Sequence, residues 1–287
     1  MGAEFEKPRD GMPQDAYAET VSAPDKDTVR SEAPRRIIPC LDTKDGRVVK
    51  GVRFIALRDI GDVAELAVRY AEEGADALAV LDISATEEGR ATRLDLVRAV
   101  RSRTNLSLIV GGGIRSLDDV LRLLDAGATQ VSVGSYAVER PAFLEEVAQS
   151  VGSERLILAL DAKWTEDRGY VVAIRGGKVL TEYSARAFAR EAVERGVGEI
   201  LLTSVDADGV QRGYDLLLTD CIAREVPVPV IASGGAGKLE HFVEVFERTR
   251  AQAALAASVF HDRILTVREV KEELARRGIP VHLPPSA

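Results

Sequence analysis

Short apolar runs alternate with amphipathic stretches from Arg36 to the C-terminus, and this alternation predicts a series of parallel βα units. Parallel strands need long crossovers, which helices usually supply. Eight such units are arranged most simply as one closed barrel, so we predict the α/β class and a single (β/α)8 TIM barrel. The predicted strands cover residues 36–41, 78–82, 106–110, 129–133, 156–161, 199–204, 228–232 and 252–256.

Two segments between these strands show apolar residues at helical spacing, 62–73 and 116–126, and Ser116 is placed to cap the second. The side chains expected to face inward are Ala64, Leu66, Ala67 and Tyr70 in the first segment, and Val120, Leu121, Leu123 and Leu124 in the second. After the fifth strand, apolar runs at 169–173 and 178–180 flank Gly176-Gly177, which predicts an additional hairpin.

The chain also repeats itself with a period of about 120 residues, the length of four βα units. The shared features are Leu41-Asp42-Thr43-Lys44 with Leu160-Asp161-Ala162-Lys163, Gly111-Gly112-Gly113 with Ser233-Gly234-Gly235, and Val133-Gly134-Ser135 with Ala256-Ala257-Ser258. Each feature follows an equivalent strand, at the end of the barrel where TIM barrels carry their active sites. We therefore predict two half-barrel repeats.

Residues 1–35 differ from the rest of the chain, because prolines and charged residues dominate and no periodicity is present. Such a composition buries little apolar surface. We predict a disordered or loosely packed tail over residues 1–35 and the barrel over residues 36–287.

Composition limits the partners and the compartment. The net charge is −8 and no run of Lys or Arg occurs, which argues against a nucleic acid or an anionic membrane as a partner. Neither a membrane-spanning stretch nor a secretion signal is evident, so we expect a cytoplasmic protein. The two cysteines, Cys40 and Cys221, are too few for a disulfide framework, and the apolar strand around Cys40 favours a packed thiol over a nucleophile.

Asp42 and Asp161 end the first and fifth predicted strands, which stand opposite each other in an eight-stranded barrel. Both carboxylates are therefore expected in one mouth, where such a pair can act as general acid and base on two faces of a substrate. The alternative for each is a loop cap or an ion pair with a nearby lysine, and the equivalent placement in both halves favours catalysis. The histidines lie outside the predicted mouth loops and no His or Cys cluster has metal-ligand spacing, so we expect neither a metal nor another cofactor.

Two glycine-rich runs, 111–113 and 234–237, each follow a strand and precede a helix. Their backbone N–H groups can bind phosphate oxygens, and Ser135 and Ser258 on the following loops can add hydroxyl donors. Either run alone is equally consistent with a tight βα turn. The symmetric pair predicts two phosphate sites and hence a small substrate with two phosphates.

Two further features stay open on the residues alone. Lys50 lies in a predicted loop after the first strand, where it either reaches a phosphate or the reacting centre, or is simply solvated. The run Asp206-Ala207-Asp208-Gly209 can form an Asx turn, bind a metal weakly or direct one carboxylate into the mouth.

Seven runs of the sequence, at residues 36–42, 46–51, 110–114, 198–204, 206–209, 231–237 and 256–261, together resemble the cyclase subunit of imidazole glycerol phosphate synthase, the HisF family of histidine biosynthesis. The likeness extends from about Arg35 to the C-terminus. It implies that ammonia from a glutaminase subunit attacks the ribulosyl carbonyl of a bis-phosphate substrate, and that ring closure and C–N cleavage follow.

The resemblance also implies roles for individual residues. Asp42 and Asp161 match the two catalytic carboxylates, and Lys50 and Asp208 match supporting positions. The residues assigned to substrate and phosphate binding are Lys50, Gly112, Gly113, Gly134, Ser135, Thr203, Asp208, Gly209, Gly234, Gly235, Ala257 and Ser258.

Some positions depart from the family pattern. The family commonly has a ring of four charged residues at the barrel floor that gates ammonia, and the corresponding residues here are Arg36, Ala77, Gln130 and Glu199. Thr129 stands where an acidic residue usually faces the glutaminase, and the loop 53–57 lacks the customary asparagines. These changes predict altered coupling to the glutaminase. The competing interpretations are the sister isomerase of the same pathway and a non-catalytic barrel scaffold.

Overall fold

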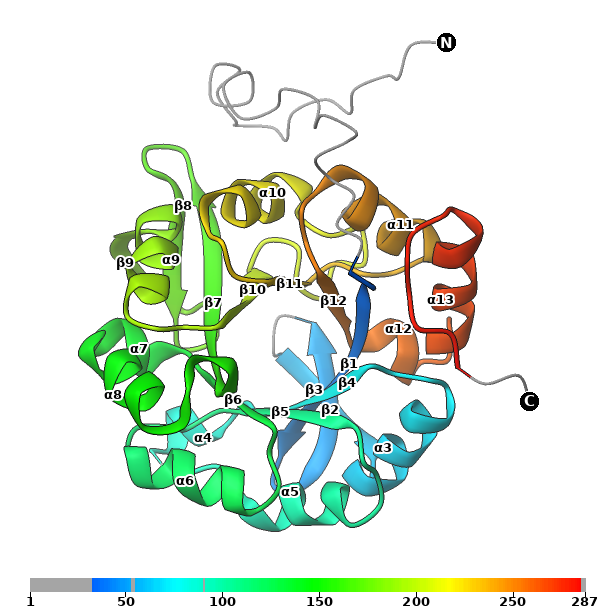
Figure 1. The fold of residues 1–287 in the computed structure, drawn as a ribbon, viewed down its shortest axis with the longest axis horizontal. Coiled ribbons are helices and arrows are strands. Elements are labelled where there is room, and N and C mark those ends of the chain that lie inside the picture. Colours follow the sequence, from blue (N-terminus) through cyan, green and yellow to red (C-terminus); the bar gives the residue numbers. More distant parts are fainter. Residues whose placement is uncertain (1–32, 53–54, 90, 285–287) are drawn as a thin grey trace.

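Eight parallel strands form the centre of the molecule in the computed structural model, which describes residues 33–52, 55–89 and 91–284. They close into a barrel because the last strand pairs with the first, Arg36 opposite Ala253 and Pro39 opposite Ala256. In chain order they are β1 (Arg36–Lys44), β4 (Ala77–Asp82), β5 (Ser107–Gly111), β6 (Gln130–Val133), β7 (Leu156–Thr165), β10 (Glu199–Ser204), β11 (Val230–Ser233) and β12 (Ala253–Ala256). Figure 1 shows a ring of helices around these strands, so the predicted (β/α)8 barrel is confirmed.

The helices of the outer ring follow the predicted apolar spacing. They are α3 (Val63–Glu72), α4 (Ala85–Glu88), α5 (Leu94–Arg101), α6 (Leu117–Asp125), α7 (Ser135–Glu139), α8 (Ala142–Val151), α9 (Ala185–Glu194), α10 (Leu216–Glu225), α11 (Leu239–Arg248), α12 (Ser258–His261) and α13 (Val267–Arg276), with a 3-10 turn η1 (Ser153–Arg155). The predicted inward face of α3 is buried throughout. In α6, Ser116 forms the predicted N-cap and Val120 and Leu123 are buried. Leu121 is 47% exposed, so its predicted inward orientation is wrong. It follows Val120 by one residue, and consecutive helical residues point about 100° apart.

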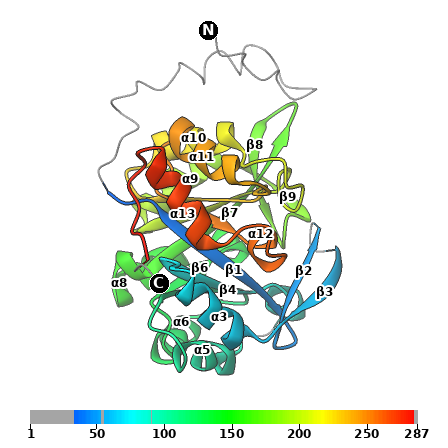
Figure 2. The ribbon, with the colours of Figure 1, turned by 90° about the vertical axis from the view of Figure 1, so that its right-hand side faces the viewer.

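Two antiparallel hairpins extend from the carboxyl end of the barrel, where Figure 2 shows them on the same side of the molecule. The predicted hairpin is formed by β8 (Gly169–Ile174) and β9 (Val179–Ser184) after β7. A second hairpin, β2 (Arg47–Val52) and β3 (Ile55–Gly61), follows β1 and was not predicted. It places Lys50 on a strand, so the predicted loop position is wrong. β1 and β7 run past their predicted ends because their last residues pair with β2 and β8.

The strands bury both of their faces, as parallel barrel strands do. One face packs against the helices, and the other forms a separate apolar cluster inside the barrel. Ile38, Ala77, Ile109, Ile157, Leu201 and Ile231 belong to this inner cluster. Each fully buried isoleucine there contributes about 2 kcal/mol to stability through burial. The interior is therefore packed apolar material between the floor and the mouth.

A buried lysine helps to close the barrel at its floor. Lys271 of α13 is 1% exposed, and its ammonium donates to the Gly74 carbonyl at 2.6 Å, to Asp76 at 2.7 Å and to the His282 carbonyl at 2.9 Å. Asp76 in turn accepts from the backbone N–H of Ile37 at 2.7 Å. These bonds join the first βα unit to the C-terminal segment.

Residues 1–32 of the predicted tail lie outside the described part of the chain. Its last residue, Arg35, is buried, and its N–H donates to the Pro280 carbonyl at 2.7 Å. Arg35 is thus part of the barrel's closure. Among the described helices, none combines the length and the apolar character needed to cross a bilayer.

Candidate functional site

A cavity of about 710 Å³ opens at the carboxyl end of the barrel strands. Every residue that the sequence assigned to catalysis or to substrate binding lies on its wall. These are Asp42, Lys50, Gly112, Gly113, Gly134, Ser135, Asp161, Thr203, Asp208, Gly209, Gly234, Gly235, Ala257 and Ser258. The structure therefore brings together residues from both half-barrels in one cavity.

Asp42 is held by a lysine from the neighbouring hairpin. The Lys50 ammonium lies 3.1 Å from Asp42 Oδ2, and Asp42 is 6% exposed. Burial alone would lower the pKa of Lys50, but the Asp42 and Asp208 carboxylates outweigh it and raise that pKa above its usual range. Lys50 consequently stays cationic, and the interpretation of a solvated loop lysine is wrong.

Cys40 lies beside Asp42, with Sγ 3.4 Å from Asp42 Oδ1. Burial, together with the Asp42 carboxylate, raises the pKa of the Cys40 thiol well above its usual value. A thiol in this state is a poor nucleophile, because the thiolate is the reactive form. The structure thus agrees with a packed thiol.

Asp161 ends up in a different environment on β7. Burial of its carboxyl group raises the pKa of Asp161 to about 7, and the nearby Asp208 carboxylate adds to this, while the Thr203 hydroxyl opposes it through a hydrogen bond. Asp161 and Thr203 are neighbours in the pairing of β7 with β10. Near neutral pH this carboxyl group can both donate and accept a proton.

The two aspartates of the loop after β10 have separate functions. Asp206 accepts a hydrogen bond from the Trp164 backbone N–H at 2.9 Å, so it fixes the loop against the end of β7. Asp208 lies on the cavity wall, and its charge affects the pKa values of Lys50 and Asp161 alike. Of the three interpretations left open for this loop, the structure shows one carboxylate directed to the mouth.

The glycine runs form two corners of the cavity. Gly112 and Gly235 have φ values of 98° and 106°, a region that disfavours other residues. A Cβ atom would lie 2.2 Å from the Asp82 carbonyl at Gly112 and 2.0 Å from the Gly213 carbonyl at Gly235. Each glycine run is therefore required for close backbone approach. Ser135 and Ser258 begin the short helices α7 and α12 at these two corners.

Several cationic side chains on the cavity wall were not assigned from the sequence: Lys44, Arg115, Arg175 and Lys178. Arg175 lies in the turn between β8 and β9, with φ at 56°. Its backbone N–H donates to Ser135 Oγ at 2.9 Å, and its guanidinium lies 3.3 Å from Glu139. The Gly176-Gly177 turn was the only sequence signal near it, and that signal does not reveal that the turn folds over Ser135.

Two of the histidines, His241 and His261, are buried away from the cavity wall, as expected. Within residues 33–52, 55–89 and 91–284, no group of three His, Cys, Asp or Glu side chains is arranged to hold a metal ion.

At the opposite end of the barrel, Glu199 joins two of the predicted gate residues. It forms an ion pair with Arg36 and accepts a hydrogen bond from Gln130 Nε2 at 3.2 Å. Ala77 lies in the inner apolar cluster and offers only a methyl group. Thr129 accepts hydrogen bonds from the Leu108 N–H at 3.0 Å and from Arg101 at 3.3 Å.

Comparison with known proteins identifies the family. Residues 36–266 match the family described as "Histidine biosynthesis protein". The chain is 53% identical over 248 residues to "Imidazole glycerol phosphate synthase subunit HisF" of Geobacillus thermodenitrificans (strain NG80-2), which covers 86% of this chain and 98% of the relative. The chain belongs to the HisF family.

Other HisF relatives agree. The protein of the same name from Bacillus pumilus (strain SAFR-032) is 51% identical over 86% of this chain and 98% of its own length. That from Clostridium botulinum (strain Okra / Type B1) is 49% identical over 87% of this chain and 99% of its own length. The prediction of an imidazole glycerol phosphate synthase cyclase subunit, a lyase-type enzyme of histidine biosynthesis, is therefore confirmed at the level of the family, and the sister isomerase and the scaffold are not supported.

Proposed function

We propose that this chain uses ammonia to convert the phosphoribulosyl-formimino-aminoimidazole carboxamide ribotide into imidazole glycerol phosphate and aminoimidazole carboxamide ribotide. The observation that carries the proposal is one cavity that holds two unlike carboxyl groups, Asp42 and Asp161, between two glycine and serine corners. A substrate with a phosphate at each end would span the corners and leave its centre between the carboxyl groups. Backbone N–H groups and hydroxyls at each corner suit phosphate oxygens.

The environments of the two carboxyl groups support different roles. When ammonia adds to the ribulosyl carbonyl, the oxygen must gain a proton and later leave as water, and the nitrogen must lose protons. Asp161, with a pKa of about 7, suits the proton donor for this oxygen. Asp42, oriented by Lys50 at 3.1 Å, suits the acceptor for a proton from nitrogen. Ring closure and cleavage of the C–N bond then release both products.

Product analysis tests the proposal directly. The purified chain is incubated with the ribulosyl substrate and an ammonium salt, and the products are identified by chromatography and mass spectrometry. Equal amounts of imidazole glycerol phosphate and aminoimidazole carboxamide ribotide are expected. Isomerised substrate alone, or unchanged substrate, would contradict the proposal.

We further propose that ammonia is delivered by a glutaminase subunit docked at the barrel floor, in the cytoplasm. The relatives are named as subunits, which supports a partner in general terms. The residues at the floor favour a looser coupling between glutamine hydrolysis and product formation than is usual in the family. Glu199 is braced by Arg36 and Gln130, whereas Ala77 supplies no charge on its side of the floor.

The coupling is measured as the ratio of glutamine hydrolysed to product formed with a standard glutaminase partner. We expect an excess of hydrolysis for the unmodified chain. The combined changes Ala77→Glu, Gln130→Lys and Thr129→Asp restore the charges of the family pattern and should bring the ratio toward one. A ratio near one for the unmodified chain would show that the floor is not loose.

A further inference from the structure

Helix α12 carries the serine of the C-terminal phosphate corner, yet it is too short to hold its own position. It spans only Ser258–His261, and its N-cap residue, Ala257, makes no side-chain capping hydrogen bond. A single helical turn is unstable alone, because nucleation fixes several residues for one hydrogen bond. The position of Ser258 is therefore set by the contacts of α12 with its surroundings.

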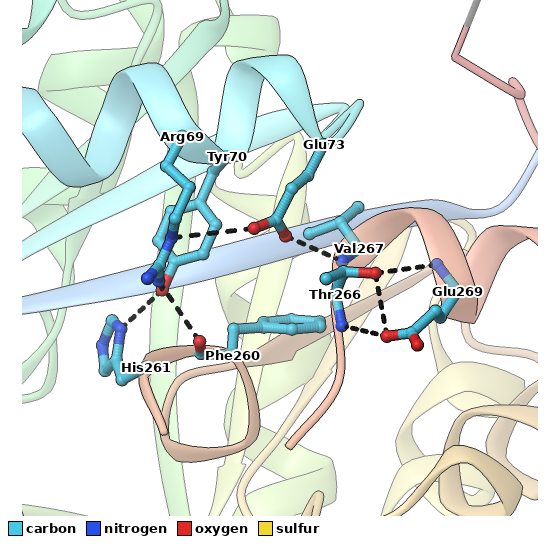
Figure 3. A network of polar contacts seen from close by, with 8 residues as sticks. All are labelled: Arg69, Tyr70, Glu73, Phe260, His261, Thr266, Val267 and Glu269. Carbon is cyan, nitrogen blue, oxygen red and sulfur yellow. Dashed lines mark hydrogen bonds and ion pairs between the residues drawn. The ribbon is translucent and has the colours of Figure 1, made fainter. Parts of the chain in front are cut away.

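Helix α3 supplies polar contacts to the last two residues of α12, as Figure 3 shows. Tyr70 Oη lies 2.6 Å from His261 Nδ1. The Arg69 guanidinium donates to the Phe260 carbonyl at 3.2 Å and to Tyr70 Oη at 2.6 Å. Glu73, the C-cap residue of α3, accepts from the N–H of Val267 at 3.0 Å, at the start of α13. Helix α3 thus holds both ends of the segment that joins α12 to α13.

Burial keeps both Tyr70 and His261 uncharged. It lowers the pKa of His261 to about 4, so the imidazole is neutral near pH 7. It also raises the pKa of Tyr70 above its usual range, so the phenol keeps its proton. Both groups are therefore uncharged near pH 7. The Tyr70 hydroxyl accepts from Arg69 and shares a second hydrogen bond with His261 Nδ1, and linked hydrogen bonds of this kind strengthen one another.

His261 also lies close to β1, which carries Asp42, but it does not line the cavity. The Asp42 carboxylate and the Cys40 backbone carbonyl each act to raise its pKa, and the Lys50 and Arg69 cations act to lower it. His261 is not among the residues on the cavity wall. It can therefore act on the substrate only through the residues that it holds in place.

The N-terminal phosphate corner is held in another way. Val138 occupies the position in α7 that His261 occupies in α12, three residues after the serine, and it is an apolar buried residue. Tyr136 of α7 packs edge-on against Phe143 with ring centres 5.1 Å apart. Ser135 receives its hydrogen bond from the Arg175 backbone on the cavity side. The contacts from Arg69 and Tyr70 thus belong to the C-terminal corner, whereas α7 at the N-terminal corner is tied to the β8–β9 turn through Arg175 and Glu139.

We propose that Arg69, Tyr70 and His261 are positioning residues that fix Ser258 for phosphate binding. The proposal rests on the proposed function of this corner as a phosphate site. It predicts that loss of their contacts weakens phosphate binding at Ser258 and leaves binding at Ser135 unchanged.

The decisive variant is Tyr70→Phe, which deletes the hydroxyl and keeps the ring that packs edge-on against Phe260 at 6.2 Å. The full chain is titrated with inorganic phosphate, and the amide NMR signals of Ser258 and Ser135 report the two corners separately. We expect about fivefold weaker binding at Ser258 for the loss of one hydrogen bond, and no change at Ser135. Tyr170→Phe is the matched control, because it deletes a hydroxyl that donates to Asp215 at 3.0 Å elsewhere in the barrel. Both corners should bind phosphate normally in this control.

A histidine pair provides an independent test. His261→Asn keeps a side-chain acceptor near the place of Nδ1 and should retain most of the phosphate binding at Ser258, whereas His261→Leu should lose it.

With the ribulosyl substrate and ammonium salt, Tyr70→Phe should raise KM about fivefold and change kcat less than about twofold. Equal phosphate binding by wild type and Tyr70→Phe, or equal weakening at both corners, would contradict the proposal that Arg69, Tyr70 and His261 position Ser258. If the wild type shows no turnover while Tyr70→Phe still weakens phosphate binding at Ser258 alone, that result would refute the proposed reaction but not the positioning role of Arg69, Tyr70 and His261.

Discussion

The two half-barrels place an aspartate at the same point of the fold and surround it differently. Asp42 in the first half faces Lys50, which the β2–β3 hairpin brings to 3.1 Å. In the second half, Ala173 of the β8–β9 hairpin stands opposite Asp161, and among the described residues none forms an ion pair with Asp161. The barrel repeat therefore sets where each carboxyl group lies, and the hairpin beside it decides whether a cation contacts that group.

The strongest test of this comparison removes each carboxyl group in turn. Asp42→Asn and Asp161→Asn keep the shape of the side chain and abolish its proton transfer. Ammonia-dependent turnover should fall by about 10² to 10⁴ in each variant, the range typical of general acids and bases. Near-wild-type turnover in both variants would refute their catalytic assignment.

Lys50→Met removes the cation that distinguishes the first half from the second. Without it, Asp42 loses its orienting charge-assisted hydrogen bond, so turnover should fall about 10- to 100-fold. Steady-state kinetics with ammonium salt measures this. Lys163→Met, at the corresponding end of β7 but off the cavity wall, serves as the control and should retain wild-type turnover.

The two aspartates should also affect stability with opposite signs. The pKa of Asp161 is about 7 in the folded state against an ordinary value near 4, so its contribution to stability is lost as the pH rises through this interval. Asp161→Asn should therefore be more stable than wild type at pH 8, by roughly 2 kcal/mol, with a smaller gain at pH 5.5. Asp42→Asn leaves the buried Lys50 without its nearest partner and should lose about 3 kcal/mol at pH 8. Urea denaturation at both pH values measures the difference, and equal signs would contradict the contrast.

The smallest expected effect concerns the cation above the N-terminal phosphate corner. Arg175→Gln retains the backbone bond to Ser135 and removes a guanidinium from the cavity wall. KM for the bis-phosphate substrate should rise about three- to tenfold with little change in kcat, because a charge-assisted contact to phosphate is lost. Arg168→Gln, in the turn between β7 and β8 and paired with Glu182 of β9, is the control. A KM equal to that of wild type would show that Arg175 does not contact the substrate.

Much of the fold could be predicted because apolar periodicity reports burial directly. The eight strands and the β8–β9 hairpin show strong apolar runs, and the glycine runs reveal where the backbone must approach closely. The β2–β3 hairpin could not be recognised, because β2 carries Arg47 and Lys50 among its apolar residues and resembles a polar loop. Contacts between distant segments, such as Lys50 with Asp42 or the Arg175 backbone with Ser135, depend on how each hairpin folds back. No local pattern encodes that.

The closure of the barrel has a consequence for the order of the chain itself. The first described strand is hydrogen-bonded to the last, and Arg35 bonds to Pro280 at the floor, so the two ends of the barrel lie side by side. A circularly permuted protein, opened between α8 and β7 and joined by a short linker across the present ends, would keep all eight strand pairings. Its two halves would simply exchange places along the chain. The architecture is a ring of eight units, and the point between β12 and β1 is one of several at which that ring can be opened.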